Sequence, residues 1–396
     1  MRWLITLLIA LLAGCGKQAT ETPAVGRPIP IPHTRTFSVV ERDGYRIVDL
    51  HANIVTWGGA ANGPEQRVRV VLVPRSIKAP ALTGDLAGAV MVRTPVKRIA
   101  VNYGGSEALL TAIGAADRLV AVGGTKSYDD TIRERVKKGE IGQIGYGWHS
   151  PPNLDVLLAA KPDVFLMTIG DPAHADAMRR AIAMGIPVMP VFMANESDYL
   201  GPVQYARLFG MLTGRERQGE QFVAMVESGV DQVKRAVAAL PRRSVLSAWW
   251  MNGDTWMVTV RGAANHLLED AGSINVMRRP DDPRLDDTMQ MPSETVLTDG
   301  GKADCWLWRD PISKRFGDQR FLAHMRAWRD GCVFAADGGE KPGVDAFDLF
   351  ERGAIRPDLL LRDYARMLHP QLRGWPATWV RQDQRAGGSA GVSHGS

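Results

Sequence analysis

The chain has 396 residues, of which 45% are hydrophobic and 23% charged, and its formal net charge is +5. This is enough apolar material for one large domain or for two lobes with cores of their own. The positive charge is moderate and includes no Lys/Arg-rich block, so the composition argues against a nucleic-acid partner. At most it favours anionic ligands or anionic lipid weakly.

Residues 1–14 have the pattern of a secretory signal peptide. Arg2 supplies a positive start, and the apolar run from Trp3 to Leu12 is too short for a permanent membrane span. The sequence Leu12-Ala13-Gly14-Cys15 is similar to the lipobox of bacterial lipoproteins, which implies cleavage before Cys15 and acylation of its side chain. The alternative is an ordinary signal peptide with a chance cysteine. We expect a monomeric body held at the membrane by lipid.

Three further segments differ from the rest of the chain in composition. Residues 15–34 are rich in Thr, Pro, Gly and Ala and predict a flexible tether. Residues 35–95 contain β-branched, partly alternating runs, and Asp43-Gly44 is a strong hairpin-turn signal, so we predict a small β-rich accessory segment. Residues 385–396 are rich in Gly and Ser and predict a disordered tail.

From Lys97 onward short apolar strands alternate with helices, which is typical of parallel sheets covered on both faces. We assign residues 96–198 to an N-terminal lobe and 241–384 to a C-terminal lobe with the same alternation. Residues 199–240 predict a long connecting helical region, weakened in its front half by glycines such as Gly214. The predicted fold class is α/β, with two Rossmann-like lobes joined by one long helix and preceded by the β-rich segment.

Two stretches of the first lobe carry a family pattern. The first is Arg98-Ile99-Ala100-Val101-Asn102 followed by residues 106–122, and the second is residues 152–164. Together they resemble the strand–helix–strand units of the periplasmic binding proteins that serve importers of iron–siderophore, cobalamin and haem. The resemblance covers roughly residues 96–370. It implies a binding protein, not an enzyme, that captures a small molecule outside the cytoplasm and delivers it to an ABC permease.

The cleft between the lobes is the expected ligand site, because ligands of parallel α/β sheets bind beyond the carboxyl ends of the strands. The residues just after strands are, in the first lobe, Asn102, Tyr103, Gly104, Lys126, Tyr128, Tyr146, Trp148, His149, Gly170 and His174, and in the second lobe Trp249, Trp250, Met251, Met289, Gln290, Arg309 and Arg315. Aromatic rings suit flat ligands, and the three basic side chains suit carboxylates or an anionic ferric chelate. The alternative is that about half of the Trp residues are core and that the basic residues are solvated surface charges.

The sequence leaves the ligand open among a ferric siderophore, cobalamin and haem, and it indicates no resident cofactor. Haem needs one axial His or Tyr, for which Tyr103, Tyr128, His149 and His174 are candidates. A free-metal receptor would need several converging ligands, whereas the 8 His are scattered. The chain lacks a Gly-Lys-Ser/Thr phosphate loop and His-Glu-x-x-His, and its Gly-x-Ser-x-Gly matches, at residues 387–391 and 391–395, lie in the Gly/Ser-rich tail and not at a strand-to-helix turn. A secreted lipoprotein enzyme, or a structural or adhesive lipoprotein on this scaffold, stays the alternative.

The resemblance also implies that one carboxylate from each lobe docks on the permease. The matching positions are Asp155 and Glu294, each in the first turn of a predicted helix. Acidic residues are common there because they complement the helix dipole, which is the alternative interpretation. Asp155 is one methylene shorter than the family's usual Glu, so its reach is smaller.

Two cysteines remain for the body of the protein. Cys305 and Cys332 open consecutive predicted strands of the second lobe, with one helix between them. Such a crossover commonly sets the strands side by side, within disulfide range, and the compartment is oxidising. We therefore predict a disulfide, with two buried free thiols as the alternative.

Overall fold

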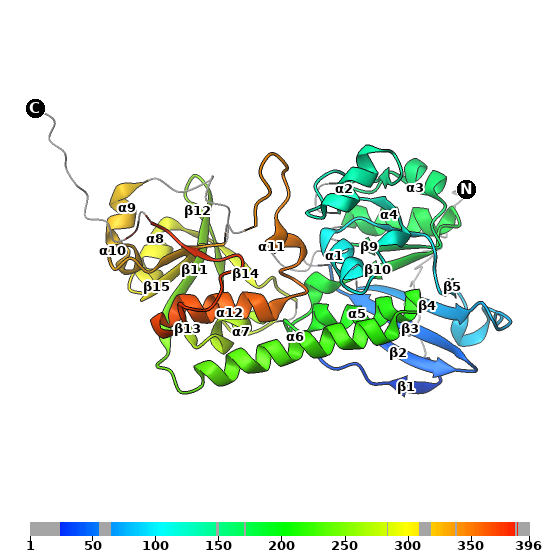
Figure 1. Ribbon diagram of the computed structural model, residues 1–396, viewed down its shortest axis with the longest axis horizontal. Helices are drawn as coiled ribbons and strands as arrows, with labels where there is room; N and C mark the ends of the chain where they lie inside the picture. Colours follow the sequence, from blue (N-terminus) through cyan, green and yellow to red (C-terminus); the bar gives the residue numbers. More distant parts are fainter. Residues whose placement is uncertain are drawn as a thin grey trace, which may run out of the picture.

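The computed structural model describes residues 24–54, 65–147, 150–169, 172–282, 284–308, 318–336, 339–384 and 386. In these ranges the strands form three sheets, one N-terminal and one in each of two lobes (Figure 1). Cys15, the predicted signal peptide and most of the predicted C-terminal tail lie outside them. None of the helices within these ranges is both long and apolar enough to cross a membrane.

The N-terminal sheet has the strand order β1-β2-β3-β4-β5. Its strands are β1 (Arg27–Ile29), β2 (Phe37–Arg42), β3 (Tyr45–Ala52), β4 (Gln66–Pro74) and β5 (Val90–Thr94). Neighbours are antiparallel except β4 and β5, which are parallel. Asp43 and Gly44 both have positive φ, 48° and 81°, as a tight hairpin turn between β2 and β3 requires.

The predicted flexible tether is wrong where the chain forms β1. Residues 27–29 pair with β2 along the edge of the N-terminal sheet. The Pro and Gly content suggested a tether, but proline is tolerated on an edge strand because its missing N–H is not needed there. The ordered body therefore begins before residue 34.

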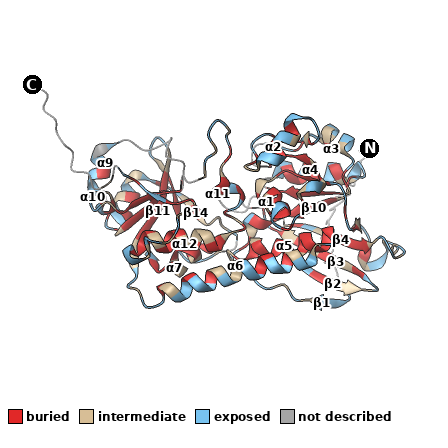
Figure 2. Ribbon diagram, in the orientation of Figure 1, coloured by how far each residue is buried: buried red, intermediate tan, exposed pale blue. Residues whose placement is uncertain are grey.

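The first lobe is a parallel sheet, as predicted, and its strand order is β10-β9-β6-β7-β8. Its elements are β6 (Ile99–Val101), α1 (Gly104–Ala112), β7 (Leu119–Val122), α2 (Asp130–Lys137), β8 (Gly142–Gln143), α3 (Leu154–Ala160), β9 (Val164–Thr168), α4 (Pro172–Ala183) and β10 (Val188–Val191). Every residue of β9 is buried, which fits a central strand covered by helices on both faces (Figure 2).

The connecting region consists of two helices, α5 (Gly201–Thr213) and α6 (Glu216–Val237), and not of one nearly continuous helix. The break lies at Gly214, whose φ of 65° is a left-handed conformation that ends α5. Along α6, Val223, Val226 and Val230 are buried at helical spacing while the opposite side faces solvent (Figure 2). The α6 helix runs under both lobes and joins them (Figure 1).

The second lobe has the strand order β14-β12-β11-β15-β16-β17, with β13 beside β11. Its strands are β11 (Arg243–Asn252), β12 (Thr255–Thr259), β13 (Ser273–Asn275), β14 (Thr288–Pro292), β15 (Cys305–Trp308), β16 (Val333–Ala335) and β17 (Arg381–Gln382). Its helices are α7 (Gly262–Asp270), α8 (Ser293–Thr295), α9 (Gln319–His324), α10 (Arg326–Arg329), α11 (Asp348–Glu351) and α12 (Pro357–Leu368).

This second sheet is mixed and not wholly parallel. The strands β13, β11, β15 and β16 are parallel neighbours, whereas β12, β14 and β17 pair antiparallel. The chain turns directly from Asn252 to Thr255, and a connection this short can join only antiparallel strands. The two-lobed α/β fold class is nonetheless confirmed.

The disulfide joins β15 to the residue that precedes β16. Cys305 and Cys332 are bonded, with an S–S distance of 2.04 Å and a Cα–Cα distance of 4.7 Å. The predicted pairing is therefore present. It lies inside the second lobe, between parallel neighbours of its sheet.

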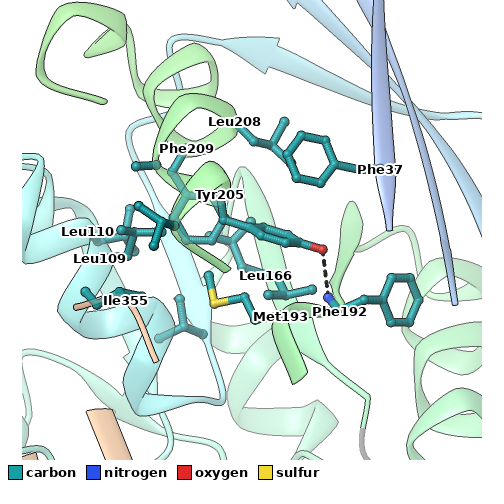
Figure 3. Close-up of a cluster of buried hydrophobic side chains, with 14 of the residues drawn as sticks. Phe37, Leu109, Leu110, Leu166, Phe192, Met193, Tyr205, Leu208, Phe209 and Ile355 are labelled. Atoms are coloured by element: carbon teal, nitrogen blue, oxygen red, sulfur yellow. Dashed lines mark hydrogen bonds between the residues drawn. The ribbon is translucent and has the colours of Figure 1, made fainter. Parts of the chain in front are cut away.

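The N-terminal sheet and the first lobe share one core (Figure 3). At its centre is Tyr205 of α5, whose ring packs edge-on against Phe37 at 4.8 Å. The Tyr205 hydroxyl accepts the N–H of Phe192 at 3.0 Å and lies 2.8 Å from the hydroxyl of Thr36. The accessory segment is thus an integral part of the first lobe's core.

Candidate functional site

Loops at the carboxyl ends of β6, β7 and β8 bring four of the predicted ligand residues to one side of the first lobe. They are Tyr103, Tyr128 and Tyr146, which are half-buried, and Lys126, which is exposed. The Lys126 N–H donates to the Tyr146 hydroxyl at 2.8 Å. We call these four residues the tyrosine wall.

Two glycines make room for the rings of this wall. A Cβ at Gly105 would lie 2.5 Å from the Tyr103 ring, and one at Gly123 would lie 2.3 Å from the Tyr146 ring. Real Cβ atoms do not approach that closely, so both positions need glycine for steric reasons. The two rings therefore lie close against the backbone of the first lobe.

The second lobe reaches the tyrosine wall through α11. The Glu351 carboxylate accepts the Tyr128 N–H at 2.6 Å, and its side chain packs against Gly104 at the start of α1. The Lys341 ammonium donates to the Tyr128 carbonyl at 2.8 Å and lies 4.5 Å from the centre of that ring. Figure 1 shows α11 between the two lobes, beside α1.

Two exposed ion pairs flank this junction. Lys126 of the first lobe pairs with Asp345 of the second, and Lys341 of the second pairs with Asp130 of the first. We call the whole junction the α11 contact: Lys341, Asp345 and Glu351 on one side, and Gly104, Lys126, Tyr128 and Asp130 on the other.

Two acidic side chains are buried together here. Glu107 of α1 is 0% exposed and Glu351 is 8% exposed. Burial raises the pKa of Glu107 to about 7; the Ser127 hydroxyl and the Gly123 N–H face it and partly lower the pKa, although neither completes a hydrogen bond of ordinary geometry. Burial first, and then the charge of Glu107, raise the pKa of Glu351 to about 8. At neutral pH this pair therefore retains protons that ordinary carboxylic acids would have lost.

The same environment affects two tyrosines. Burial, followed by the charge of Glu351, raises the pKa of Tyr103 to about 12. Burial and the charge of Glu107 also raise the pKa of Tyr146. Both phenols are therefore held in their neutral form across the physiological range.

Asn102 and His174 do not present their side chains to a ligand, contrary to prediction. Asn102 is fully buried: its amide donates to the Thr168 carbonyl at 3.2 Å and accepts the Thr168 N–H at 2.8 Å. It thereby ties the end of β6 to the end of β9. His174 is 1% exposed, with a ring nitrogen 3.1 Å from the Ser150 carbonyl oxygen.

Five of the predicted second-lobe residues lie in strands and not in loops after strands. Trp249 is buried in the second lobe's core, and Trp250 and Met251 are half-buried, because β11 continues to Asn252. Met289 and Gln290 lie in β14, which the sequence did not predict. Trp148, His149, Gly170, Arg309 and Arg315 lie outside the described residues.

The predicted docking carboxylates are both exposed. Asp155 lies in the first turn of α3, where Asn153 caps the helix by accepting the N–H groups of Asp155 and Val156. Glu294 lies in the first turn of the short α8. Exposure is compatible with docking and equally with a role at the helix start.

The sequence analysis did not predict Glu107 or the second-lobe residues of the α11 contact. Glu107 had a local signal, since it lies three residues before the buried Leu110 and so shares the inward face of α1. Lys341, Asp345 and Glu351 had no local sequence signal, because only the fold brings them to the first lobe.

Within the described residues, no three His, Cys, Asp or Glu side chains come together as a metal site.

The family model for periplasmic binding proteins matches residues 99–337, which is more than half of the chain. The chain belongs to the periplasmic binding protein family. The match begins at β6 and ends before α11. The N-terminal sheet and the second-lobe side of the α11 contact are therefore outside the part by which this periplasmic binding protein is recognised.

Solved structures show the same fold. A periplasmic haem-binding protein from Pseudomonas aeruginosa is 18% identical, with a TM-score of 0.55, covering 74% of this chain and 100% of that one. A siderophore-binding protein solved with acinetobactin and ferric iron is 17% identical, with a TM-score of 0.52, covering 69% and 93%. The vitamin B12-binding protein of Vibrio cholerae is 13% identical, with a TM-score of 0.52, covering 71% and 99%. No curated protein matches the sequence significantly.

Proposed function

We propose that this protein is the extracytoplasmic solute-binding lipoprotein of an ABC importer. It binds a ferric siderophore, a corrinoid or a haem-like tetrapyrrole between its lobes and delivers it to the permease. Membership of the periplasmic binding protein family supports the general role. The observation that carries the ligand class is the tyrosine wall at the carboxyl ends of β6, β7 and β8, where parallel α/β sheets bind their ligands.

The chemistry of the wall suits a large, flat or aromatic chelate. The rings of Tyr103, Tyr128 and Tyr146 offer rigid apolar area with polar edges. Lys126 and Lys341 supply positive charge at the same place, which favours ligands that carry carboxylates. Solved relatives that bind haem, a ferric siderophore and vitamin B12 make these three classes the first to test.

Haem would need an axial ligand, and the surroundings of two of the four candidate His and Tyr residues disfavour that role. The raised pKa values of Tyr103 and Tyr146 oppose the tyrosinate form that would bind ferric iron. His174 is buried and bonded to the backbone. Tyr128 and His149 are the remaining candidates for that role.

In this proposal, delivery of the ligand depends on a lipid anchor in the membrane and on docking to the permease. Cys15 carries the lipid anchor, so that the monomeric body stays near the permease. The exposed Asp155 and Glu294, one from each lobe, pair with basic side chains of the permease. The protein acts by binding and release, without catalysis.

The test is a calorimetric and optical screen of the soluble body. The protein should begin at residue 24, because β1 belongs to the N-terminal sheet. We expect one of ferric siderophores, corrinoids and haem to bind with micromolar affinity or better, about −8 kcal/mol. A Soret band in protein from its native host would identify haem, and a corrin spectrum cobalamin. No heat and no fluorescence change with any class would refute the ligand assignment.

A pair of variants locates the site. Tyr128→Ala removes the ring but keeps the backbone groups that contact Glu351 and Lys341, so the α11 contact stays available. We expect ligand affinity to fall at least tenfold. Tyr199→Ala, at a half-buried tyrosine that bonds Asp270, is the control and should bind like the wild type. Equal loss in both variants would place the ligand elsewhere.

A further inference from the structure

The α11 contact brings an acidic side chain of the second lobe to the helix of the first lobe that carries a buried acidic side chain. Glu351 reaches the start of α1, and Glu107 is buried on the same helix. Within the described residues no Lys or Arg forms an ion pair with either carboxylate. Arg352, next in the chain, is instead paired with Asp348, which also accepts the indole N–H of Trp379. Neither carboxylate therefore has an ion-pair partner among these residues, and Arg352 acts on Glu351 only through a Coulombic attraction.

We propose that the α11 contact is a proton-dependent latch between the lobes, closed when the Glu107–Glu351 pair holds protons and opened when both carboxylates ionise. Opening exposes the tyrosine wall. The latch itself is a property of the ligand-free protein. Only its consequence, control of access to the wall, rests on the proposed function.

Other charged and titratable groups surround Glu351, and they do not reverse the direction of the proposed effect, in which ionisation of the acidic pair opens the latch. From the elements packed around it these are Glu107, Tyr103, Lys126, Tyr128, Asp129, Asp130, Arg133, Tyr146, Lys341, Asp348 and Arg352. The Arg133 guanidinium donates to the backbone carbonyls of Ser127 and Tyr128, and Lys341 donates to Tyr128 and Asp130. The acids Asp129 and Asp348 add to the negative charge and raise the pKa of Glu351 further.

The direction of the effect follows from proton linkage. In the open state Glu351 is solvated and ionises near its ordinary pKa of 4.5, whereas in the closed state its pKa is about 8. Between these values closing takes up a proton, so closing becomes less favourable by up to about tenfold per pH unit. The latch is fully favoured below about pH 5 and loses its proton-linked stabilisation as pH rises to about 8. The flanking ion pairs are exposed and individually weak, so they do not offset a change of that size.

Amide hydrogen exchange of the ligand-free protein tests the latch directly. The Tyr128 N–H is bonded to Glu351 across the contact, so its protection reports closure. Measured against the intrinsic exchange rate at each pH, protection at Tyr128 should fall at least tenfold from pH 6 to pH 8. The N–H of Leu166, in the central strand β9, should stay protected and so exclude global unfolding. Parallel loss at Leu166, or constant protection at Tyr128, would overturn the proposal.

Three variants assign the effect to the acidic pair. Glu351→Gln keeps the hydrogen-bond acceptor but cannot ionise, and its Tyr128 protection should not change with pH. Glu107→Gln should shrink the pH-dependent fall, because the Glu107 charge raises the pKa of Glu351. Glu340→Gln makes the same chemical change at an exposed position of the same segment and should behave like the wild type. If Glu351→Gln keeps the wild-type pH dependence, the latch is wrong whatever the ligand screen shows.

Discussion

Glu196 joins the N-terminal sheet to the first lobe, and its removal should destabilise both together. The carboxylate follows β10, is 6% exposed, and accepts the N–H groups of Arg35 at 2.9 Å and Thr36 at 3.3 Å. It also accepts the hydroxyls of Thr34 and Thr36. In Glu196→Ala the hydroxyls can turn elsewhere, but the Thr36 N–H loses its acceptor in a buried place and the Arg35 N–H loses its acceptor in a partly buried one. The loss costs about 1–3 kcal/mol for the buried Thr36 group and less for the partly solvated Arg35 group, so we expect the free energy of unfolding to fall by about 1–4 kcal/mol.

Urea denaturation followed by far-ultraviolet circular dichroism measures this change. The control is Glu220→Ala, which removes a 57%-exposed carboxylate paired with Arg207 and should cost less than about 1 kcal/mol. The wild type should unfold the N-terminal sheet and the first lobe in one transition, because they share a core. A loss below about 1 kcal/mol in Glu196→Ala, or a separate early transition of the N-terminal sheet in the wild type, would refute this reasoning.

Three further outcomes are expected. Thiol counting of the denatured, unreduced soluble body should find no free cysteine, and replacing Cys305 and Cys332 by Ser should cost about 3.5 kcal/mol for a separation of 27 residues; two free thiols would contradict this. The double change Asp155→Lys with Glu294→Lys should abolish uptake in cells while ligand affinity stays within a few-fold of wild type; unchanged uptake would make them helix-start residues only. Cys15→Ser should prevent fatty-acid incorporation, and equal labelling of the variant would show that the lipobox assignment is wrong.

The sequence analysis predicted the helices and strands whose sequence patterns lie within the element itself. The apolar run of β9 and the helix α12 were predicted at or near their observed bounds, because an uninterrupted apolar strand and a proline at the first helical position are visible in the chain itself. Gly214 was seen as a weak point, but whether it breaks the helix depends on α5 folding back onto α6, which is tertiary information. The strand β1 was missed because its Pro28 lowers strand propensity anywhere except at a sheet edge.

The sequence analysis predicted residues only on the first-lobe side of the α11 contact. Tyr103, Lys126, Tyr128 and Tyr146 follow recognisable strands, so their convergence could be expected. The helix α11 has a single turn, too short to be stable alone, and it is held by long-range bonds such as Glu351 to Tyr128. No window of sequence contains both partners of such a bond, which is why that half of the site was not found.

The packing of α6 limits how far the latch can move the lobes. This helix has 22 residues, about 33 Å in length, and makes close backbone approaches on both sides. A Cβ at Gly219 would lie 2.4 Å from the carbonyl oxygen of Ala206 in α5, and one at Gly229 would lie 2.8 Å from Asp358 in α12. The first lobe is thus fixed to one half of α6 and the second lobe to the other half. A rotation about a flexible hinge is not available to a continuous helix held in this way, so opening of the proposed latch is expected to be a small separation where α11 meets the tyrosine wall. In the proposed latch, therefore, Glu351, which is 8% exposed in this structure, has to become hydrated through a small movement of α11 and not through a large rotation of the lobes.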